Sequence, residues 1–251
     1  MKLYYSRLQL ELTRRCNQNC AHCCRGESQN IDLTKEIVDE FFEKNDIYCI
    51  SNLLFSGGEP TLNGRILEYI VDKIIEKEII VNMFMLSING LSYSEELING
   101  LNKLQKYIIS KSKISRHKAG LLMISQDQFH KEANNEVIEK LKDLPYFSPI
   151  DKHIIKEKNI LPYGRALENG LSRQQPDLSN LTNYQKNYRI KEYEGTNYLI
   201  VNYQYISANG NVINNGCESY DLMDEYALGN VQNQSIEEIY IKDKSKKLTL
   251  K

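Results

Sequence analysis

The sequence predicts an α/β fold: a partial (β/α)6 TIM-like barrel, open on one side, followed by a short C-terminal extension of a hairpin and a helix. Through the first two-thirds of the chain, apolar segments of strand length alternate with segments that carry apolar residues at helical spacing. Residues 79–86 are apolar almost throughout, as expected for a parallel strand covered on both faces. This alternation predicts about six parallel βαβ units with right-handed crossovers.

The first eight expected elements are four strands that alternate with four helices. In residues 8–12 leucines alternate with polar residues, which predicts a strand that runs directly into a group of cysteines. Ser92 and Glu95 have the spacing of a capping box ahead of the third helix. The expected order is strands at 8–12, 50–55, 79–86 and 121–124, with helices at 37–42, 66–75, 97–108 and 137–144.

The pattern is less regular after the fourth helix. Strands are expected near 150–155 and 198–206. Between them, residues 168–194 are rich in Asn, Gln, Ser and Tyr without a clean period, which indicates a long loop or lid with short helical pieces.

The end of the chain shows signs of a hairpin and a helix. An Asn209-Gly210 turn joins 198–206 to 212–213, which predicts the hairpin, and 235–240 predicts the helix. We therefore expect a core in residues 1–166, with the remaining barrel element, the lid-like loop and the tail in residues 167–251.

Composition narrows the function classes. The 251 residues suffice for one barrel-sized domain or two small ones. With 32 basic and 33 acidic residues the net charge is −1, so no global field favours nucleic acid or anionic lipid. No apolar run approaches the roughly 20 residues that span a bilayer, and the first residues lack the features of a signal peptide. We expect a cytoplasmic protein without a nucleic-acid or membrane partner.

Four of the six cysteines lie within residues 16–24, whereas Cys49 and Cys217 are isolated. In a chain without a leader sequence, such clustering favours metal or redox chemistry over disulfides. Cys16, Cys20 and Cys23 have C-x3-C-x2-C spacing. Structural zinc commonly uses two distant pairs, and no second pair follows here, although a zinc-binding interaction module is the non-enzymatic alternative. Three thiolates suit a four-iron cluster whose fourth iron is left open.

These motifs together resemble the radical S-adenosylmethionine (SAM) superfamily over residues 8–166. The similarity rests on the cysteine spacing, on the lead-in Thr13-Arg14-Arg15-Cys16-Asn17, and on Gly57-Gly58-Glu59-Pro60 about one βα unit later. It implies a partial barrel of the radical SAM type in which Cys16, Cys20 and Cys23 hold a 4Fe–4S cluster that cleaves SAM, and it implies that Cys24 is not a ligand. His22 fills a position that is usually aromatic in the family.

The resemblance also implies the residues of a SAM site. Gly57 and Gly58 would let the backbone approach the methionine amino group closely, Glu59 would add a carboxylate, and Pro60 would fix the turn. Further residues follow later strands, where barrel enzymes gather their chemistry. They are Asn89, then Ser125 and Asp127 of a Ser-x-Asp segment, and Arg165 of a glycine–arginine motif that could pair with the SAM carboxylate.

The tail resembles a degenerate SPASM extension, which normally carries auxiliary clusters. Only Cys217 remains there, and one thiolate cannot hold a cluster, so we expect a single 4Fe–4S cluster. Without an auxiliary electron acceptor a redox-neutral reaction such as epimerisation is easier to achieve. That reaction needs a hydrogen donor, for which Cys217 and Cys49 are the candidates.

Substrate and partners are constrained only broadly. The resemblance implies a peptide or small-metabolite substrate and an electron donor such as flavodoxin or ferredoxin. The first cluster ligand comes at position 16, so no leader-binding domain is expected before the barrel, and a peptide would need residues 168–194 or a separate partner. A glycyl-radical activating enzyme is the second enzymatic alternative, and the SPASM-like tail argues against it.

Overall fold

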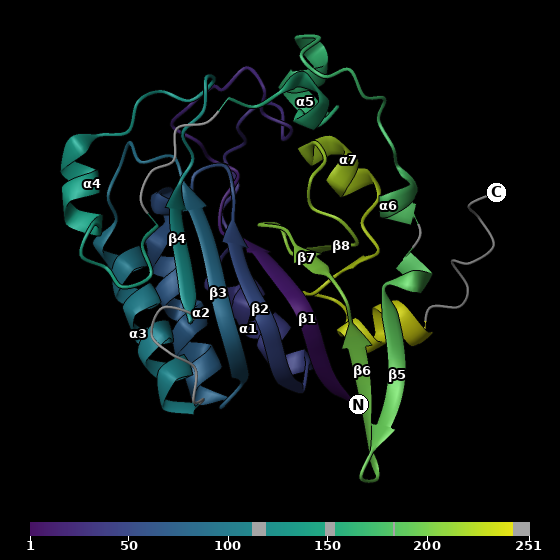
Figure 1. Ribbon diagram of the computed structural model, residues 1–251. Coiled ribbons are helices and arrows are strands. Elements are labelled where there is room, and N and C mark those ends of the chain that lie inside the picture. Colours follow the sequence, from purple (N-terminus) through teal and green to yellow (C-terminus); the bar gives the residue numbers. More distant parts are fainter. Residues whose placement is uncertain (112–118, 149–153, 183, 243–251) are drawn as a thin grey trace.

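The computed structural model describes residues 1–111, 119–148, 154–182 and 184–242. Within them, the strands form one open sheet whose first half is parallel, in the order β4-β3-β2-β1 (Figure 1). These four strands are β1 (Lys2–Glu11), β2 (Ile47–Ser56), β3 (Ile80–Ile88) and β4 (Gly120–Ile124). The predicted α/β class is therefore observed.

The register of the parallel strands aligns their carboxyl ends. Leu10 pairs with Phe55, Phe55 with Leu86, and Leu86 with Leu122, so one row of apolar residues crosses all four strands. Because parallel strands in such a register end at the same edge, the loops that follow them meet there. The cysteine group, the Gly57-Gly58 turn and the residues after β3 and β4 are brought to this edge.

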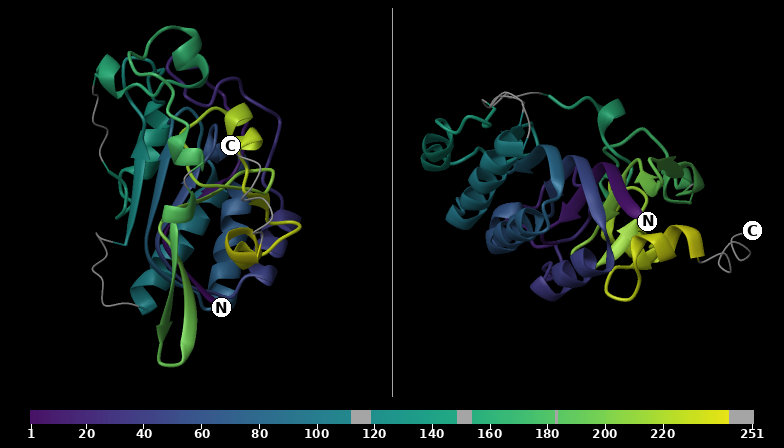
Figure 2. Two further views of the ribbon diagram at one scale, coloured as in Figure 1. Left: turned by 90° about the vertical axis from the view of Figure 1, so that its right-hand side faces the viewer. Right: turned by 90° about the horizontal axis from the view of Figure 1, so that it is seen from below.

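Helices cover the sheet as the apolar stripes predict. Figure 2 shows α1 (Lys35–Lys44), α2 (Gly64–Glu76) and α3 (Glu95–Lys111) side by side along one side of the curved sheet. Thr34 caps α1 by accepting a bond from the Ile37 amide, and Pro60–Asn63 forms a 3-10 turn, η1, ahead of α2. The fourth helix, α4 (Asn135–Leu141), follows β4.

The predicted capping box at α3 is wrong. Ser94, not Ser92, accepts the bond from the Leu97 amide, at 3.2 Å. Ser92 instead lies 2.7 Å, oxygen to oxygen, from the hydroxyl of Thr61. Two serines within three residues offered the same signal, and only the local backbone decides which one caps the helix.

The region around 150–155 differs from the expected fifth strand. Residues 149–153 lie outside the described part of the chain, and residues 154 and 155 are not in a strand. A single parallel bridge joins Phe147 to Leu122 at this side of the sheet. Two short helices follow, η3 (Glu157–Asn159) and α5 (Gly164–Glu168).

The expected strand at 198–206 is two strands that both pair parallel with β1. β6 (Thr196–Val201) pairs with its first half and β7 (Gln204–Ile206) with its second half. Inside the region expected to be a loop lie α6 (Ser179–Thr182), η4 (Tyr184–Lys186) and a further strand, β5 (Tyr188–Tyr193).

β5 forms an antiparallel hairpin with β6 that the sequence reading missed. Its two-residue turn, Glu194-Gly195, has positive φ angles of 49° and 74°. This is the backbone that a tight hairpin requires. The signal was present as a two-residue Glu-Gly break between runs rich in β-branched and aromatic residues, but the polar residues before it hid the strand.

The tail folds largely as expected. β7 and β8 (Asn211–Ile213) form the predicted hairpin, with Gly210 at a φ of 82°. After it come α7 (Tyr220–Glu225) and β9 (Gly229–Asn230). The terminal helix, expected at 235–240, is a π-helical segment, η5 (Glu238–Lys242).

One cluster of buried apolar side chains runs from Leu3 to Tyr240 and unites residues from both sides of the expected boundary at 166. A second, smaller cluster joins Tyr205, Tyr220 and Met223 in the tail. The tail is thus packed onto the core at many points. Among the residues described, no helix is both long enough and apolar enough to cross a bilayer.

Candidate functional site

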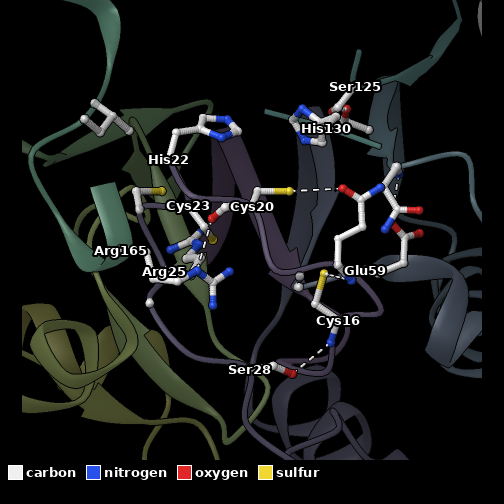
Figure 3. A pocket seen from close by; sticks show the side chains of 18 of the residues that line it. Cys16, Cys20, His22, Cys23, Arg25, Ser28, Glu59, Ser125, His130 and Arg165 are labelled. Atoms are coloured by element: carbon white, nitrogen blue, oxygen red, sulfur yellow. Dashed lines mark hydrogen bonds between the residues drawn. The ribbon is translucent and has the colours of Figure 1, made fainter. Parts of the chain in front are cut away.

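A cavity of about 350 Å³ lies at the carboxyl edge of the parallel strands, and all four of the clustered cysteines line it (Figure 3). Its walls come from the loops after β1, β2, β3 and β4 and from the segment that enters α5. The sequence-predicted residues on these walls are Cys16, Cys20, His22, Cys23, Gly57, Gly58, Glu59, Asn89, Ser125 and Arg165; Pro60, Asp127 and Cys217 do not line the cavity.

The cysteine loop is held by bonds at both of its ends. The Cys16 amide donates to Ser28 Oγ at 3.0 Å, and the Cys23 amide donates to the Cys20 carbonyl at 3.1 Å. The amide of Gln29 donates to the carbonyl of Arg14 at 3.2 Å, which closes the loop at its base. The three thiols therefore project from a defined turn rather than from an open strand.

In this loop Cys16 and Cys20 favour the neutral thiol over the charged thiolate. Burial, together with the neighbouring Cys23 and Cys16 thiols, raises the pKa of Cys20 to about 11. Burial is also the main reason that the pKa of Cys16 is raised. Gln18 accepts a bond from Cys20 Sγ at 3.0 Å, sulfur to oxygen. A bound cationic cluster would replace the thiol protons and so offset the repulsion between the neighbouring thiolates.

The spacing of the sulfurs bears on which metal would fit. A tetrahedral zinc with bonds of about 2.3 Å needs sulfurs roughly 3.8 Å apart. Among the described residues, the only group of three or more possible ligands within 4.8 Å of one another is His22, Asp127 and His130. Within the described part of the chain, Cys16, Cys20 and Cys23 do not form such a compact group. A four-iron cube takes each thiolate on a different iron.

Gly57 and Gly58 serve the cysteine loop directly. The Gly58 amide donates to the Thr13 carbonyl at 2.8 Å, and the next amide, of Glu59, donates to the Arg15 carbonyl, also at 2.8 Å. A Cβ on Gly57 would lie 2.5 Å from the Thr13 oxygen, and one on Gly58 would lie 2.4 Å from the Arg15 oxygen. The glycines are therefore required for the close approach of the Thr13–Arg15 segment that follows β1, and their approach to the methionine amino group of SAM stays a prediction.

Glu59 joins the ends of two strands. It is almost fully buried; one carboxylate oxygen accepts bonds from the amide and hydroxyl of Thr61, and the other accepts a 2.8 Å bond from the Asn89 amide. Burial raises the pKa of Glu59, although these bonds oppose the shift. Pro60, buried behind Glu59, begins η1 and fixes the turn as predicted.

Asn89 and Ser125 reach the cavity from neighbouring strands. The Asn89 side chain donates to Asn17 Oδ1 at 2.6 Å, which ties the end of β3 to the cysteine loop. The Ser125 hydroxyl lies 2.7 Å from that of Ser87. Both side chains thus lie on the same wall, beside Glu59, in positions that could contact a polar ligand.

Asp127 holds two histidines instead of lining the cavity. Its Oδ2 lies 2.9 Å from His130 Nδ1 and 3.6 Å from His22 Nε2. The His22 ring also stacks on Phe129, with ring centroids 4.6 Å apart. His130 lines the cavity, although the sequence alone gave no reason to separate it from surface histidines. The signal was its position three residues after Asp127, on the same turn.

Arg165 lies against the cysteine loop. It is buried, its Nε donates to the Cys20 carbonyl at 3.1 Å, and its Nη1 lies 3.4 Å from Glu27. Beside it, the Asn169 side chain donates to the Ala21 carbonyl at 2.9 Å. α5 therefore satisfies carbonyl groups that the tight loop leaves without partners. The sequence did not suggest this role for the glycine–arginine motif.

The remaining cysteines lie in different environments. Cys24 also contributes to the cavity wall, and burial raises the pKa of its thiol to about 11. Cys217 is exposed, on the loop between β8 and α7. Cys49 is buried near the start of β2, so about 23 Å of extended strand separates it from the cavity edge at Ser56. Cys49 is thereby excluded as a hydrogen donor.

Sequence reasoning missed several other wall residues. Ile155, Ile160 and Leu161 supply an apolar side opposite the strand ends, and Gln18 and Arg25 come from the cysteine loop itself. Gln18 and Arg25 could have been found from their positions within or next to the cysteine group. The three apolar residues carry no motif, and only the folded chain brings them to the site.

The sequence resemblance is confirmed by comparison with known proteins. Residues 10–110 match the family model of the radical SAM superfamily. Over 134 residues the chain is 27% identical to the protein YydG of Bacillus subtilis (strain 168), whose name assigns it provisionally to peptide biosynthesis. That match covers 51% of this chain and only 38% of the relative.

Solved structures confirm the fold class. The crystal structure of BtrN in complex with AdoMet and 2-DOIA superposes with a TM-score of 0.54 at 15% identity, covering 95% of this chain and 83% of BtrN. Native anSMEcpe with bound AdoMet and the Cp18Cys peptide gives a TM-score of 0.53 at 15% identity, covering 97% of this chain and 81% of anSMEcpe. The open parallel sheet is therefore the partial barrel that the sequence predicts.

Proposed function

Because residues 10–110 match the radical SAM superfamily, we propose that this chain is a radical SAM enzyme that uses one 4Fe–4S cluster held by Cys16, Cys20 and Cys23. Cys16, Cys20 and Cys23 would hold the cluster, which when reduced would supply the electron that cleaves SAM and so initiates hydrogen-atom abstraction from the substrate. The protein binds, orients and shields the reacting groups. The meeting of Cys16, Cys20 and Cys23 in the cavity that the Gly57-Gly58 turn also lines supports this proposal most directly.

Different walls of the cavity are proposed to bind different parts of SAM. Gly57, Gly58 and Glu59 form a rigid turn beside the cysteine loop, with Pro60 and Asn89 fixing its two sides. This turn lines the cavity, and we assign it to the methionyl end of SAM. Ser125 would accept or donate a bond at the end of β4.

Charged and aromatic groups complete the SAM site. Arg165 has guanidinium donors beyond the one that contacts Cys20, and these suit the SAM carboxylate. His22, stacked on Phe129 and held by Asp127, presents a flat ring to the cavity. We assign these residues to binding and orientation, not to proton transfer.

A peptide or small molecule is the proposed substrate. The similarity to YydG favours a peptide, because that protein's name refers to peptide biosynthesis. The apolar wall of Ile155, Ile160 and Leu161 would shield the radical from water. An electron donor such as flavodoxin or ferredoxin would reduce the cluster.

Cys217 is the proposed hydrogen donor if the reaction is redox-neutral. Its S–H would give a hydrogen atom to the substrate radical, forming the new C–H bond and leaving a thiyl radical on Cys217. One electron from the external donor and one proton from solvent would then restore the thiol. Cys217 does not line the cavity, but its neighbour Glu218 accepts a bond from Arg25 of the cavity wall, and its exposed position allows the electron and the proton to reach it.

Anaerobic reconstitution tests the proposal. The wild-type protein should take up about four irons and four sulfides per chain and become brown. Cys16→Ala, Cys20→Ala and Cys23→Ala should each prevent this. Cys24→Ala is the matched control, because it removes a thiol from the same cavity wall but should leave iron content unchanged. Colourless protein with one equivalent of zinc would refute the proposal.

A further inference from the structure

Arg14, two residues before the first cluster cysteine, connects the cysteine loop to the tail. Its guanidinium is completely buried and donates to Glu11 Oε2 at 3.1 Å and to Gln29 Oε1 at 2.8 Å. It also makes a bidentate pair with Asp224 of α7, at 2.7 and 2.8 Å. Since Gln29 also bonds to the Arg14 backbone, these contacts lie at the base of the loop.

Residues of the tail also bond to the two carboxylates that contact Arg14. Asp224 Oδ1 accepts bonds from the side chains of Asn209 and Asn211, both at 3.0 Å. Glu11, the second carboxylate at Arg14, accepts 2.7 Å from the Tyr205 hydroxyl and 2.9 Å from the Ala208 amide. Both carboxylates that neutralise Arg14 are therefore fixed by residues of the β7–β8 hairpin.

The far end of the cysteine loop is also held by the tail. Arg25, directly after Cys24, lies over the Tyr205 ring at 5.1 Å and donates to the Glu218 carbonyl at 3.3 Å. The Tyr220 amide donates to the Arg25 carbonyl at 3.1 Å. The same short tail segment thus contacts the chain on both sides of the thiols.

The contacts of Arg14 depend on the charges of its carboxylate partners. The completely buried guanidinium of Arg14 is balanced by two carboxylates, and removing the charge of Asp224 leaves only Glu11 to balance it and weakens its bidentate partner. Bidentate geometry also fixes the plane of the guanidinium, so the loop base has little freedom to turn. Asp224 is itself 36% exposed, so what sets this pair apart from Arg15–Asp32, exposed by 36% and 39%, is the complete burial of the Arg14 side chain. A pair with two partly exposed members contributes far less.

We infer that Asp224 and Tyr205 are positioning residues for the cluster: the tail, which retains one cysteine, braces both ends of the cysteine loop through Arg14 and Arg25. The part of this inference that concerns the cluster rests on the proposed function. The brace itself is a property of the chain, so it can be measured without the cluster as well.

The test compares three variants. Asp224→Asn keeps the shape of the side chain but removes its charge, and Tyr205→Phe removes only the hydroxyl that bonds Glu11. Asp32→Asn is the matched control, because it breaks an exposed Arg–Asp pair on the same loop. Each protein is studied without iron, by the rate at which a thiol reagent alkylates Cys16, Cys20 and Cys23, and after reconstitution, by iron loss to a chelator and by the EPR spectrum.

With Asp224→Asn we expect alkylation and iron loss to be about tenfold faster and the EPR line shape to change. Tyr205→Phe should change all three in the same direction by a smaller factor, and Asp32→Asn should stay within about twofold of wild type. If Asp224→Asn does not fold, Tyr205→Phe decides alone. Rates and spectra equal to those of Asp32→Asn would overturn the inference. Wild-type protein that never binds iron would instead refute the proposed function, while the alkylation rates would still decide the brace.

Discussion

The α-carbon of Gly58 faces the carbonyl oxygen of Arg15 so closely that an added Cβ would lie 2.4 Å from it. The neighbouring amide, of Glu59, donates to that same carbonyl at 2.8 Å. The turn after β2 and the strand leading to the cysteines are therefore locked backbone to backbone. Glycine is required at this position whether or not a cofactor is bound.

Gly58→Ala should destabilise the apo protein by about 3 kcal/mol, because neither backbone can move aside without breaking these bonds. The free energy of unfolding, from urea denaturation, measures the effect. Gly170→Ala is the control: its Cβ would meet nothing within 4 Å, so it should cost only the backbone strain of about 1 kcal/mol that a residue with a side chain meets at a φ of 62°. Equal losses in the two variants would contradict the packing explanation.

Glu59→Gln should destabilise the protein by roughly 2 kcal/mol, since the amide that replaces one carboxylate oxygen cannot accept from both Thr61 and Asn89. Thermal unfolding of the apo protein, converted to free energy, gives the value. Glu68→Gln, on the exposed face of α2 in a surface pair with Lys103, should cost far less. A Glu59→Gln variant as stable as Glu68→Gln would show that the buried bonds do not need the carboxylate.

The Arg14–Asp224 pair should make stability depend on pH. Burial tends to raise the pKa of Asp224, but the bonds from Arg14 and Asn209 outweigh it and the pKa is lowered. A carboxyl with a lowered folded-state pKa stabilises the fold above its unfolded pKa of about 4 and loses this contribution as the pH falls further.

We therefore expect the stability difference between wild type and Asp224→Asn to be largest near neutral pH and to shrink below about pH 4. Denaturation of both apo proteins from pH 7 down to pH 3 measures it. A difference that stays constant or grows on acidification would mean that Asp224 does not act through its charge.

His22 should bind SAM through its ring and not through its charge. His22→Phe preserves the stacking on Phe129 and should keep the SAM dissociation constant within about threefold, whereas His22→Ala should weaken it about tenfold. Equilibrium binding to the reconstituted protein distinguishes the two. If His22→Phe and His22→Ala lose the same affinity, stacking of the His22 ring is not what contributes to SAM binding.

Cys217→Ser should separate the two halves of the proposed reaction. With any substrate that turns over, the variant should still form 5′-deoxyadenosine but should yield little redox-neutral product, because the hydrogen donor is missing. Cys49→Ser is the control, since Cys49 lies at the far end of β2 and should not affect product formation. Mass spectrometry of the substrate in deuterated buffer follows the exchanged hydrogen. Full product formation by Cys217→Ser would remove Cys217 from the mechanism.

Local pattern was sufficient to predict the parallel strands and their helices. The stripe of α2 and the alternation in β1 each report the buried face of a single element. β5 was missed because nearly all of its residues are exposed, and the alternation of Tyr188 and Ile190 with basic residues is too short to stand out. Whether Ser92 or Ser94 caps α3 likewise depends on backbone geometry that spacing alone does not encode.

Some residues of the site were likewise predictable from the sequence and others were not. Cys16, Cys20, Cys23 and Gly57-Gly58 were found because their chemistry lies in short motifs. The Arg14–Asp224 pair could not be found, because 210 positions separate its members and the chain has many arginines and aspartates. Ile155 and Leu161 line the cavity for reasons of packing alone. Contacts between distant, common residue types become visible only in the folded chain.

The most direct test of the central claim is whether the reconstituted protein cleaves SAM. Wild-type protein, reduced with dithionite under anaerobic conditions and supplied with SAM, should release 5′-deoxyadenosine and methionine in equal amounts, measured by liquid chromatography and mass spectrometry. Cys20→Ala, carried through the same procedure, should release neither. Wild-type protein that carries a full complement of iron and yet leaves SAM intact would contradict the assignment.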